Sequence, residues 1–272
     1  MAATASFLTP CITPLVLFRD QIRLGVATGF FLKVDGAWNL VTNWHVFSGC
    51  RPDTGQPRHS NGAVPNKCIF FRSGLSDEKI TWAPETLDLG DALTDTANWF
   101  QHPARGQSVD VASFPISGEQ VGKSKDLLEA DAHDPDMFVD VGGEVFLPGY
   151  PQGLTGGGRF PLWKRASLAT SLEWGVGIED RFFVDTASRE GMSGSPCLAI
   201  SNWQHYRMDR DTLKVSVIRS PMSWRLLGIY SGRLNAQDDF GAQVGIVWRD
   251  TLIFDVIRGG VHGSVKIAKS GG

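Results

Sequence analysis

Short runs of apolar and β-branched residues recur along the chain and are separated by turn-forming residues, a pattern typical of β-strands. The clearest example is the apolar run at 25–34, which is followed by Asp35-Gly36 and then by a second such run at 38–42. An Asp-Gly pair between two such runs predicts a β-hairpin. Further strands are predicted near 67–72, 109–116, 144–149, 165–170, 181–186, 197–201, 214–218, 224–231 and 242–248.

The spacing of these runs favours an all-β protein. The chain has 31 glycines and 14 prolines among its short strands, which indicates barrels or sandwiches rather than helical layers. Polar stretches rich in Pro and Gly, at 51–66 and 84–108, are predicted to be surface loops. The segment 117–140 is predicted to link two halves, with a short helix near 125–129.

The two ends of the chain carry no clear targeting signal. No Lys or Arg precedes Arg19, so a secretory signal is not expected. The apolar stretch 15–18 is far too short to span a membrane. The chain after Arg258 is rich in Gly and is predicted to be frayed, although 265–267 could add an edge strand.

Composition narrows the functional classes. The chain of 272 residues is long enough for one large domain or two small ones, and its net charge of −3 indicates neither a nucleic acid nor a membrane partner. The chain has no tandem Cys/His spacing of the kind that would suggest a structural zinc site. Reduced thiols in a cytoplasmic protein are the favoured interpretation of the four cysteines, with a Cys50–Cys68 disulfide as the alternative.

Three segments carry candidate chemistry. Ser193 lies in the turn-like string Gly191-Met192-Ser193-Gly194, which suits a nucleophile on a tight loop. A serine hydroxyl needs a base to take its proton, and the base needs a third group to orient it. His45, at the end of a β-like run, is the candidate base, and Asp110, which opens an alternating strand, is the candidate third group. Surface positions are the default expectation for Asp88, Asp91, Asp95, His59, His102, His133, His205 and His262.

The order His, Asp, Ser and the residues around each of them resemble the bacterial trypsin-like serine peptidases, near the HtrA-type protease domain without a PDZ domain. The matching segments are 41–46, 110–112 and 185–196, and the resemblance covers roughly 12–258. It implies two six-stranded antiparallel β-barrels of the chymotrypsin/trypsin-like fold, with the active site in the cleft between them. The implied division is a peptidase domain at 1–258 (barrel one at about 12–116, linker at about 117–140, barrel two at about 141–258) and a tail at 259–272.

The resemblance also implies roles for single residues. The amides of Gly191 and Ser193 would form an oxyanion hole, and the strand 227–233 would pair with the substrate backbone. Ser231 would lie behind Asp110 and help to orient it. The implied substrate-binding residues are Ala187, Tyr230, Ser231, Gly232, Arg233 and Gly245.

An uncharged pocket floor at Ala187 favours a medium or large apolar side chain before the scissile bond, while Arg233 at the rim leaves an acidic side chain as the alternative.

Two departures from the secreted enzymes stand out. Met192 replaces the aspartate that captures a new N-terminus, so activation by N-terminal cleavage is not expected. The disulfide that flanks the histidine has no counterpart, because Cys50 is five residues past His45, and this favours an intracellular enzyme.

The function implied is a serine endopeptidase that hydrolyses peptide bonds through an acyl-enzyme, with a protein or peptide as substrate. No metal or organic cofactor is expected, nor a nucleic acid or membrane partner, whereas a regulatory protein partner is a possible one. Two alternatives stay open: a pseudoprotease or switch-activated peptide-binding module of the same fold, and an esterase on the same scaffold. A flipped peptide bond at 190–191 would favour the binding module, and hydrolysis of small esters alone would indicate the esterase.

Overall fold

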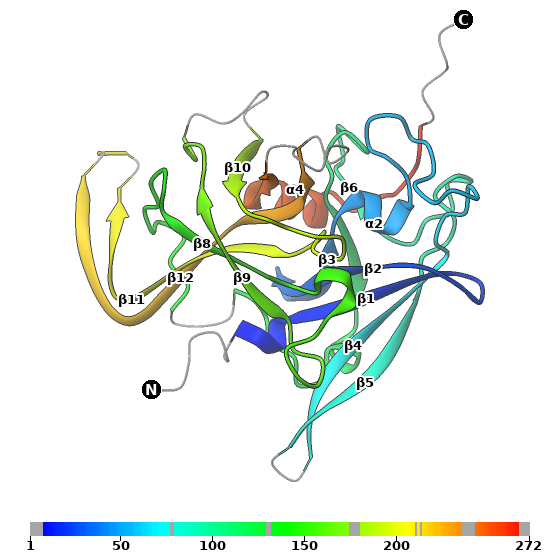
Figure 1. Cartoon of the computed structure of the whole chain (residues 1–272), viewed down its shortest axis with the longest axis horizontal. Coiled ribbons are helices and arrows are strands. Elements are labelled where there is room, and N and C mark those ends of the chain that lie inside the picture. The colour runs from blue at the N-terminus through cyan, green and yellow to red at the C-terminus, as the bar shows by residue number, and fades with distance from the viewer. Residues whose placement is uncertain are drawn as a thin grey trace, which may run out of the picture.

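Two antiparallel sheets, one built mainly from each half of the chain, lie side by side in the computed structural model (Figure 1). The structure describes residues 8–76, 79–128, 132–173, 180–209, 211–212, 214–234 and 243–266. The predicted all-β class with two antiparallel sheets is confirmed. The boundaries predicted for the two barrels and the linker stay predictions.

The first sheet has eight strands in the order β14-β6-β7-β3-β2-β1-β4-β5. Their bounds are Ile12–Arg19 (β1), Ile22–Val34 (β2), Ala37–Thr42 (β3), Lys67–Ser76 (β4), Lys79–Asp88 (β5), Phe100–Gln101 (β6), Ala112–Ile116 (β7) and Val261–His262 (β14). The predicted hairpin joins β2 to β3, with Val34 paired to Ala37. Asp35 and Gly36 have φ of 50° and 85°, as a type I′ turn requires.

The second sheet is a closed barrel of six antiparallel strands in the order β10-β13-β12-β11-β8-β9. Their bounds are Glu144–Gly149 (β8), Leu162–Leu168 (β9), Arg181–Asp185 (β10), Pro196–Met208 (β11), Val215–Arg233 (β12) and Val244–Arg249 (β13). The six-stranded barrel predicted for this half is therefore present. The first half differs, because β14 extends one edge of its sheet, the β4–β5 hairpin extends the other, and these two edges do not pair with each other.

Short helices connect the strands. They are η1 (Thr9–Cys11), α2 (Trp44–Ser48), α3 (Gly118–Val121), η2 (Pro151–Gly153) and α4 (Asp250–Gly259). The helix expected near 125–129 is wrong over its described part, 125–128. It lies at α3 instead, because Ser117 and Gln120 form a reciprocal capping box at its start.

The loop predicted at 84–108 is also wrong in part. β5 continues to Asp88 because it pairs with β4 along its whole length, and β6 lies further on at Phe100–Gln101. Two histidines expected at the surface, His102 and His205, are buried.

The described part of the C-terminal segment, up to residue 266, packs against the first sheet rather than being frayed. β14 pairs with β6, the Gly263 amide donates to the Trp99 carbonyl at 2.8 Å, and the Val265 amide donates to the Ala92 carbonyl at 3.1 Å. The predicted edge strand is thus real but lies at 261–262 rather than 265–267, whose last residue is outside the described part of the chain. The chain therefore returns from the barrel to the first sheet before it ends.

One apolar cluster joins the two sheets and holds them in a fixed relation. It contains Phe30 and Val41 from the first sheet, Leu226 and Trp248 from the barrel, and Val256 from α4, all buried. The cluster therefore excludes water from both sheets and from α4 at once.

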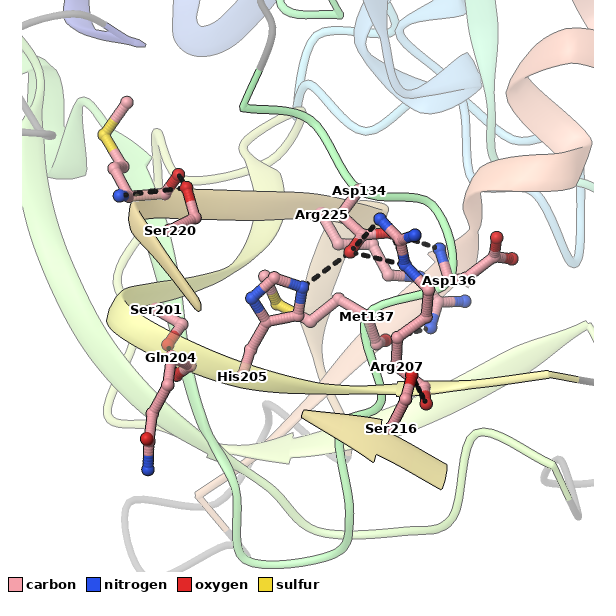
Figure 2. A network of polar contacts seen from close by, with 11 residues as sticks. Asp134, Asp136, Met137, Ser201, Gln204, His205, Arg207, Ser216, Ser220 and Arg225 are labelled. Carbon is pink, nitrogen blue, oxygen red and sulfur yellow. Dashed lines mark hydrogen bonds and ion pairs between the residues drawn. The ribbon is translucent and has the colours of Figure 1, made fainter. Parts of the chain in front are cut away.

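The connection between the sheets is fastened to the long β11–β12 hairpin. The Asp134 carboxylate accepts hydrogen bonds from His205 at 2.5 Å and from Arg207 at 2.9 Å, and all three lie together in Figure 2. The Phe138 amide donates to the Tyr206 carbonyl at 2.7 Å. The connection is therefore hydrogen-bonded to the β11–β12 hairpin at Asp134 and at Phe138.

Candidate active site

A cleft of about 870 Å³ lies between the two sheets. His45 and Gly25 line it from the first half of the chain, while Gly191, Ser193 and Ser231 line it from the second. Of the residues predicted from the sequence to act together, the base and the nucleophile thus share one cavity, and the candidate third group lies directly behind the base.

His45 is held by Asp110 through two hydrogen bonds. Its Nδ1 lies 2.7 Å from one oxygen of the Asp110 carboxylate, and its backbone amide donates to the other oxygen at 2.9 Å. The Asn43 side chain donates to the Asp110 carbonyl at 2.7 Å, which fixes the backbone of the acid as well. Because Nδ1 faces a carboxylate, that nitrogen carries the proton and Nε2 is left as an acceptor.

The contact expected between Ser231 and Asp110 is present. The Ser231 hydroxyl donates to the same Asp110 oxygen that faces His45 Nδ1. Asp110 is 2% exposed and His45 is 6% exposed, so these bonds are shielded from water. Three donors on one buried carboxylate fix its orientation, and with it the plane of the imidazole.

Ser193 lies in a tight turn that is tied to both sheets. The Thr28 amide of β2 donates to the Ser193 carbonyl at 2.8 Å, and the Gly194 amide donates to the Tyr230 carbonyl of β12 at 2.9 Å. The Ser193 hydroxyl donates to the Ser231 carbonyl at 2.9 Å. His45 Nε2 is buried and has no hydrogen-bond partner among the described residues.

The loop before Ser193 is anchored through the carbonyl of Glu190. The Gln152 amide donates to the Glu190 carbonyl at 2.6 Å. Because a trans peptide points its C=O and N–H in opposite directions, the Gly191 amide faces away from Gln152. Among the described residues, the amides of Gly191 and Ser193 have no acceptor assigned to them, so both stay available to a ligand.

Gly191 is the residue that this loop requires. Its φ is 91°, in the region that favours glycine. A Cβ there would collide with the Tyr150 carbonyl oxygen and lie 3.0 Å from the Gln152 amide nitrogen. The Gly191 carbonyl accepts a hydrogen bond from the Thr28 hydroxyl at 2.8 Å. Thr28 is a contributor that the sequence did not indicate, since it looks like any threonine in an apolar strand.

The predicted substrate-binding residues divide into two groups. Tyr230, Ser231, Gly232 and Arg233 line the cleft, whereas Ala187 and Gly245 are not among the residues that line it. Ala187 is exposed, and its carbonyl accepts a hydrogen bond from the Lys164 ammonium. Neither residue belongs to the wall of this cleft, and the space beside Gly245 is taken by a side chain.

The Tyr230 ring occupies that space. A Cβ on Gly245 would lie 2.5 Å from Tyr230 Cε2, so the ring covers this glycine, and the Tyr230 hydroxyl bonds to Ser188. Burial raises the pKa of Tyr230, although the Ser188 hydrogen bond opposes that rise. The ring thus remains a neutral phenol, and Tyr230, named from the sequence as a substrate-binding residue, lines the cleft while its ring packs against Gly245.

The sequence matches the family described as "Trypsin-like peptidase domain" over residues 27–205, well over half of the chain. The chain belongs to this family. The matched range of this trypsin-like peptidase contains His45, Asp110 and Ser193 and ends within β11. Peptidases of this family act on proteins, so a protein or peptide substrate follows at this level.

Solved structures similar to this trypsin-like peptidase are bacterial or extremophile proteases. The Rv3671c protease from M. tuberculosis in its active form is 17% identical, with 98% of this chain and 86% of that chain covered and a TM-score of 0.48. A serine endoprotease from Yersinia pestis is 13% identical (95% and 66% covered, TM-score 0.47), and the thermostable serine protease AL20 from an extremophilic microorganism is 11% identical (93% and 99% covered, TM-score 0.47). A search of curated proteins found no match.

Among the described residues, no cluster of three or more His, Cys, Asp or Glu side chains has the arrangement of a metal site. The helices found in the described residues are all too short or too polar to cross a membrane. All four cysteines are buried and none of them forms a disulfide, so the Cys50–Cys68 bridge kept as the alternative is not formed.

Proposed function

We propose that this protein is a serine endopeptidase that cleaves peptide bonds through an acyl-enzyme on Ser193. The observation that carries the proposal is the buried His45–Asp110 pair, whose free imidazole nitrogen Nε2 belongs to a residue lining the same cleft as Ser193. His205 also pairs with a buried carboxylate and has one ring nitrogen without a partner among the described residues, but it does not line the cleft; what marks His45 as the base is that it shares the cleft with Ser193.

The reaction begins when a substrate strand enters the cleft. Ser193 Oγ attacks the carbonyl carbon of the scissile bond while its proton passes to His45 Nε2. The amides of Gly191 and Ser193 donate to the developing oxyanion, and each such donor contributes about 2.7–4 kcal/mol to transition-state stabilisation. His45 then gives the proton to the leaving amine, which breaks the C–N bond and leaves an ester on Ser193.

Deacylation repeats these steps with water as the nucleophile. His45 takes a proton from the water as the water attacks the ester, and it returns that proton to Ser193 Oγ as the acid product leaves. Asp110 stabilises the imidazolium in both halves of the reaction. Because Asp110 also holds the His45 backbone amide, it fixes the position of the base as well as its tautomer.

The resting position of the Ser193 hydroxyl favours a second candidate, a site that substrate binding switches on. The hydroxyl donates to the Ser231 carbonyl instead of to His45. A substrate strand pairing with β12 would offer a backbone N–H to that carbonyl and compete with Ser193 for it. The released hydroxyl would then turn to His45 Nε2, whose unmet hydrogen bond costs about 1–3 kcal/mol when left buried.

The test of the proposal is cleavage of an unfolded protein, with new N-termini identified by mass spectrometry. Wild type and Ser195→Ala should cleave and Ser193→Ala should not. Ser195 is the matched control because its hydroxyl is buried without a partner among the described residues, two positions from the nucleophile. Hydrolysis of small esters alone would indicate the esterase, and peptide binding without cleavage would indicate the binding module.

A further inference from the structure

The cleft is lined by arginines that have no acidic partner. Arg23, Arg58, Arg189 and Arg233 line it, and Glu190 is the single acidic residue among the described lining residues. No carboxylate lies within ion-pair distance of any of the four within the described part of the chain. A chain with a net charge of −3 thus lines the cleft around the nucleophile with four arginines that form no ion pair with any described carboxylate.

Arginines elsewhere in the molecule fall into two groups. Six of them outside the cleft form ion pairs with carboxylates: Arg19, Arg72, Arg105, Arg165, Arg207 and Arg258. Arg51, Arg159, Arg181 and Arg219 form no ion pair with a described carboxylate either, so what distinguishes the cleft is that four such arginines line one cavity with a single described acidic residue. Unpaired like charges repel one another, and a ligand of opposite charge removes that repulsion.

The four arginines stand on both walls of the cleft. Arg23 is on β2 and Arg58 is in the loop between α2 and β4, while Arg189 lies just before the oxyanion loop and Arg233 ends β12. Arg233 is half-buried, and Arg23, Arg58 and Arg189 are exposed, so all four can reach a bound chain. A peptide that crosses the cleft past Ser193 therefore meets arginines from both sheets.

We propose that the substrate is an acidic polypeptide segment, with Asp or Glu residues on both sides of the scissile bond. This inference rests on the proposed peptidase function because it treats the bound peptide as a substrate. The preference for acidic residues is itself a property of binding and does not require cleavage. Opposite charges along the cleft speed encounter and select among partners more than they add to affinity. Each exposed charge pair should change binding by about 1.5- to 5-fold.

A peptide fits the cleft better than a single-stranded nucleic acid, which also carries negative charge. Nucleic-acid grooves combine cations with exposed aromatic side chains on which bases stack. Among the described lining residues, Tyr230 is the one with a phenyl ring, and it is 1% exposed. The backbone of β12 beside Arg233 instead offers strand pairing to a polypeptide.

The test is binding of two labelled peptides to the full-length Ser193→Ala protein, measured by fluorescence anisotropy. The peptides share an uncharged core and carry either four Glu or four Lys residues in the flanks. We expect tighter binding of the Glu peptide at low salt, with the difference shrinking between about 20 and 300 mM NaCl as screening increases. Equal binding of both peptides, or tighter binding of the Lys peptide, would overturn the inference.

Charge variants locate the effect. Arg189→Gln with Arg233→Gln should weaken binding of the Glu peptide by roughly 2- to 25-fold, and Arg23→Gln with Arg58→Gln should do likewise. Arg219→Gln is the matched control, because Arg219 lies on the β11–β12 hairpin and outside the cleft. An effect of the control as large as that of the cleft pairs would refute the assignment to the cleft.

Two further readouts separate the possible failures. Labelling of wild-type Ser193 by an uncharged fluorophosphonate reports the proposed function without any charge preference. Labelling without a preference for the Glu peptide would contradict only the inference of an acidic substrate, whereas a preference without labelling would contradict only the peptidase. Competition by a single-stranded RNA that binds more tightly than the Glu peptide would replace the acidic peptide with a nucleic acid.

Discussion

Replacement of Gly191 by alanine tests the oxyanion loop without touching the base or the nucleophile. The new Cβ would collide with the Tyr150 carbonyl oxygen and come within 3.2 Å of its carbon and 3.0 Å of the Gln152 amide nitrogen. These backbone atoms hold the loop and do not move as a flexible side chain would. The 190–191 peptide must therefore rotate, and the Gly191 amide leaves its position.

The expected loss can be worked from two contributions. Loss of one oxyanion donor costs about 2.7–4 kcal/mol, which lowers kcat by about 10²- to 10³-fold. An alanine at a φ of 91° adds about 1–2 kcal/mol of strain to the folded state. The first contribution acts on the transition state and the second on stability, so KM should change little while kcat falls.

The assay is steady-state hydrolysis of a quenched-fluorescent peptide, together with thermal unfolding. Gly36→Ala is the matched control, because Gly36 has a φ of 85° and the space that an added Cβ would enter is open to a distance of 4 Å. It should carry the same strain with full activity. A Gly191→Ala variant that is folded and retains kcat within about threefold of wild type would refute the role given to this loop.

Three further outcomes follow from buried groups. Asp110→Asn should lower kcat about 10⁴-fold, because an amide holds the imidazole in the wrong tautomer; a loss below about tenfold in steady-state assays would contradict the triad. Burial opposes ionisation of Asp134, but hydrogen bonds from Arg207 and His205 outweigh it and hold its pKa below the ordinary 3.8. The stabilisation is thus present above about pH 4 and lost as the pH falls through the lower folded value, so Asp134→Asn should flatten the acid decline of the unfolding free energy in urea titrations; an unchanged decline would argue against the cluster. Burial and the charge of a nearby carboxylate raise the pKa of Cys50 to about 11, so Ellman's reagent at about pH 8 should modify none of the four thiols rapidly in the folded protein and all four in denaturant; one fast thiol would contradict their burial.

Local chemistry explains which features the sequence could predict. The Asp35-Gly36 hairpin depends on two residues that tolerate a positive φ, and that preference is visible in the sequence itself. The segments around His45 and Ser193 were found because tight turns and strand ends restrict residue types. Their shared cleft followed from the resemblance to a family, since no local rule brings residues so far apart in the chain together.

The features that were missed depend on distant partners or on side-chain rotation. β14 has only two residues and exists because β6 is there to pair with it. Thr28 supports the nucleophile loop through a hydrogen bond to Gly191, a contact between β2 and a turn far along the chain. The position of the Tyr230 ring could not be predicted from the residues next to it in the sequence. The ring packs against Gly245, which lies on another strand.

The central claim is that Ser193 is a nucleophile activated by His45, and covalent labelling tests it most directly. Wild type, Ser193→Ala and Ser195→Ala would be treated with a fluorophosphonate, and the modified residue identified by tandem mass spectrometry. The account predicts one label per chain on Ser193 in wild type and in Ser195→Ala, and none in Ser193→Ala. Folded wild-type protein that stays unlabelled, or a label on any other residue, would contradict it.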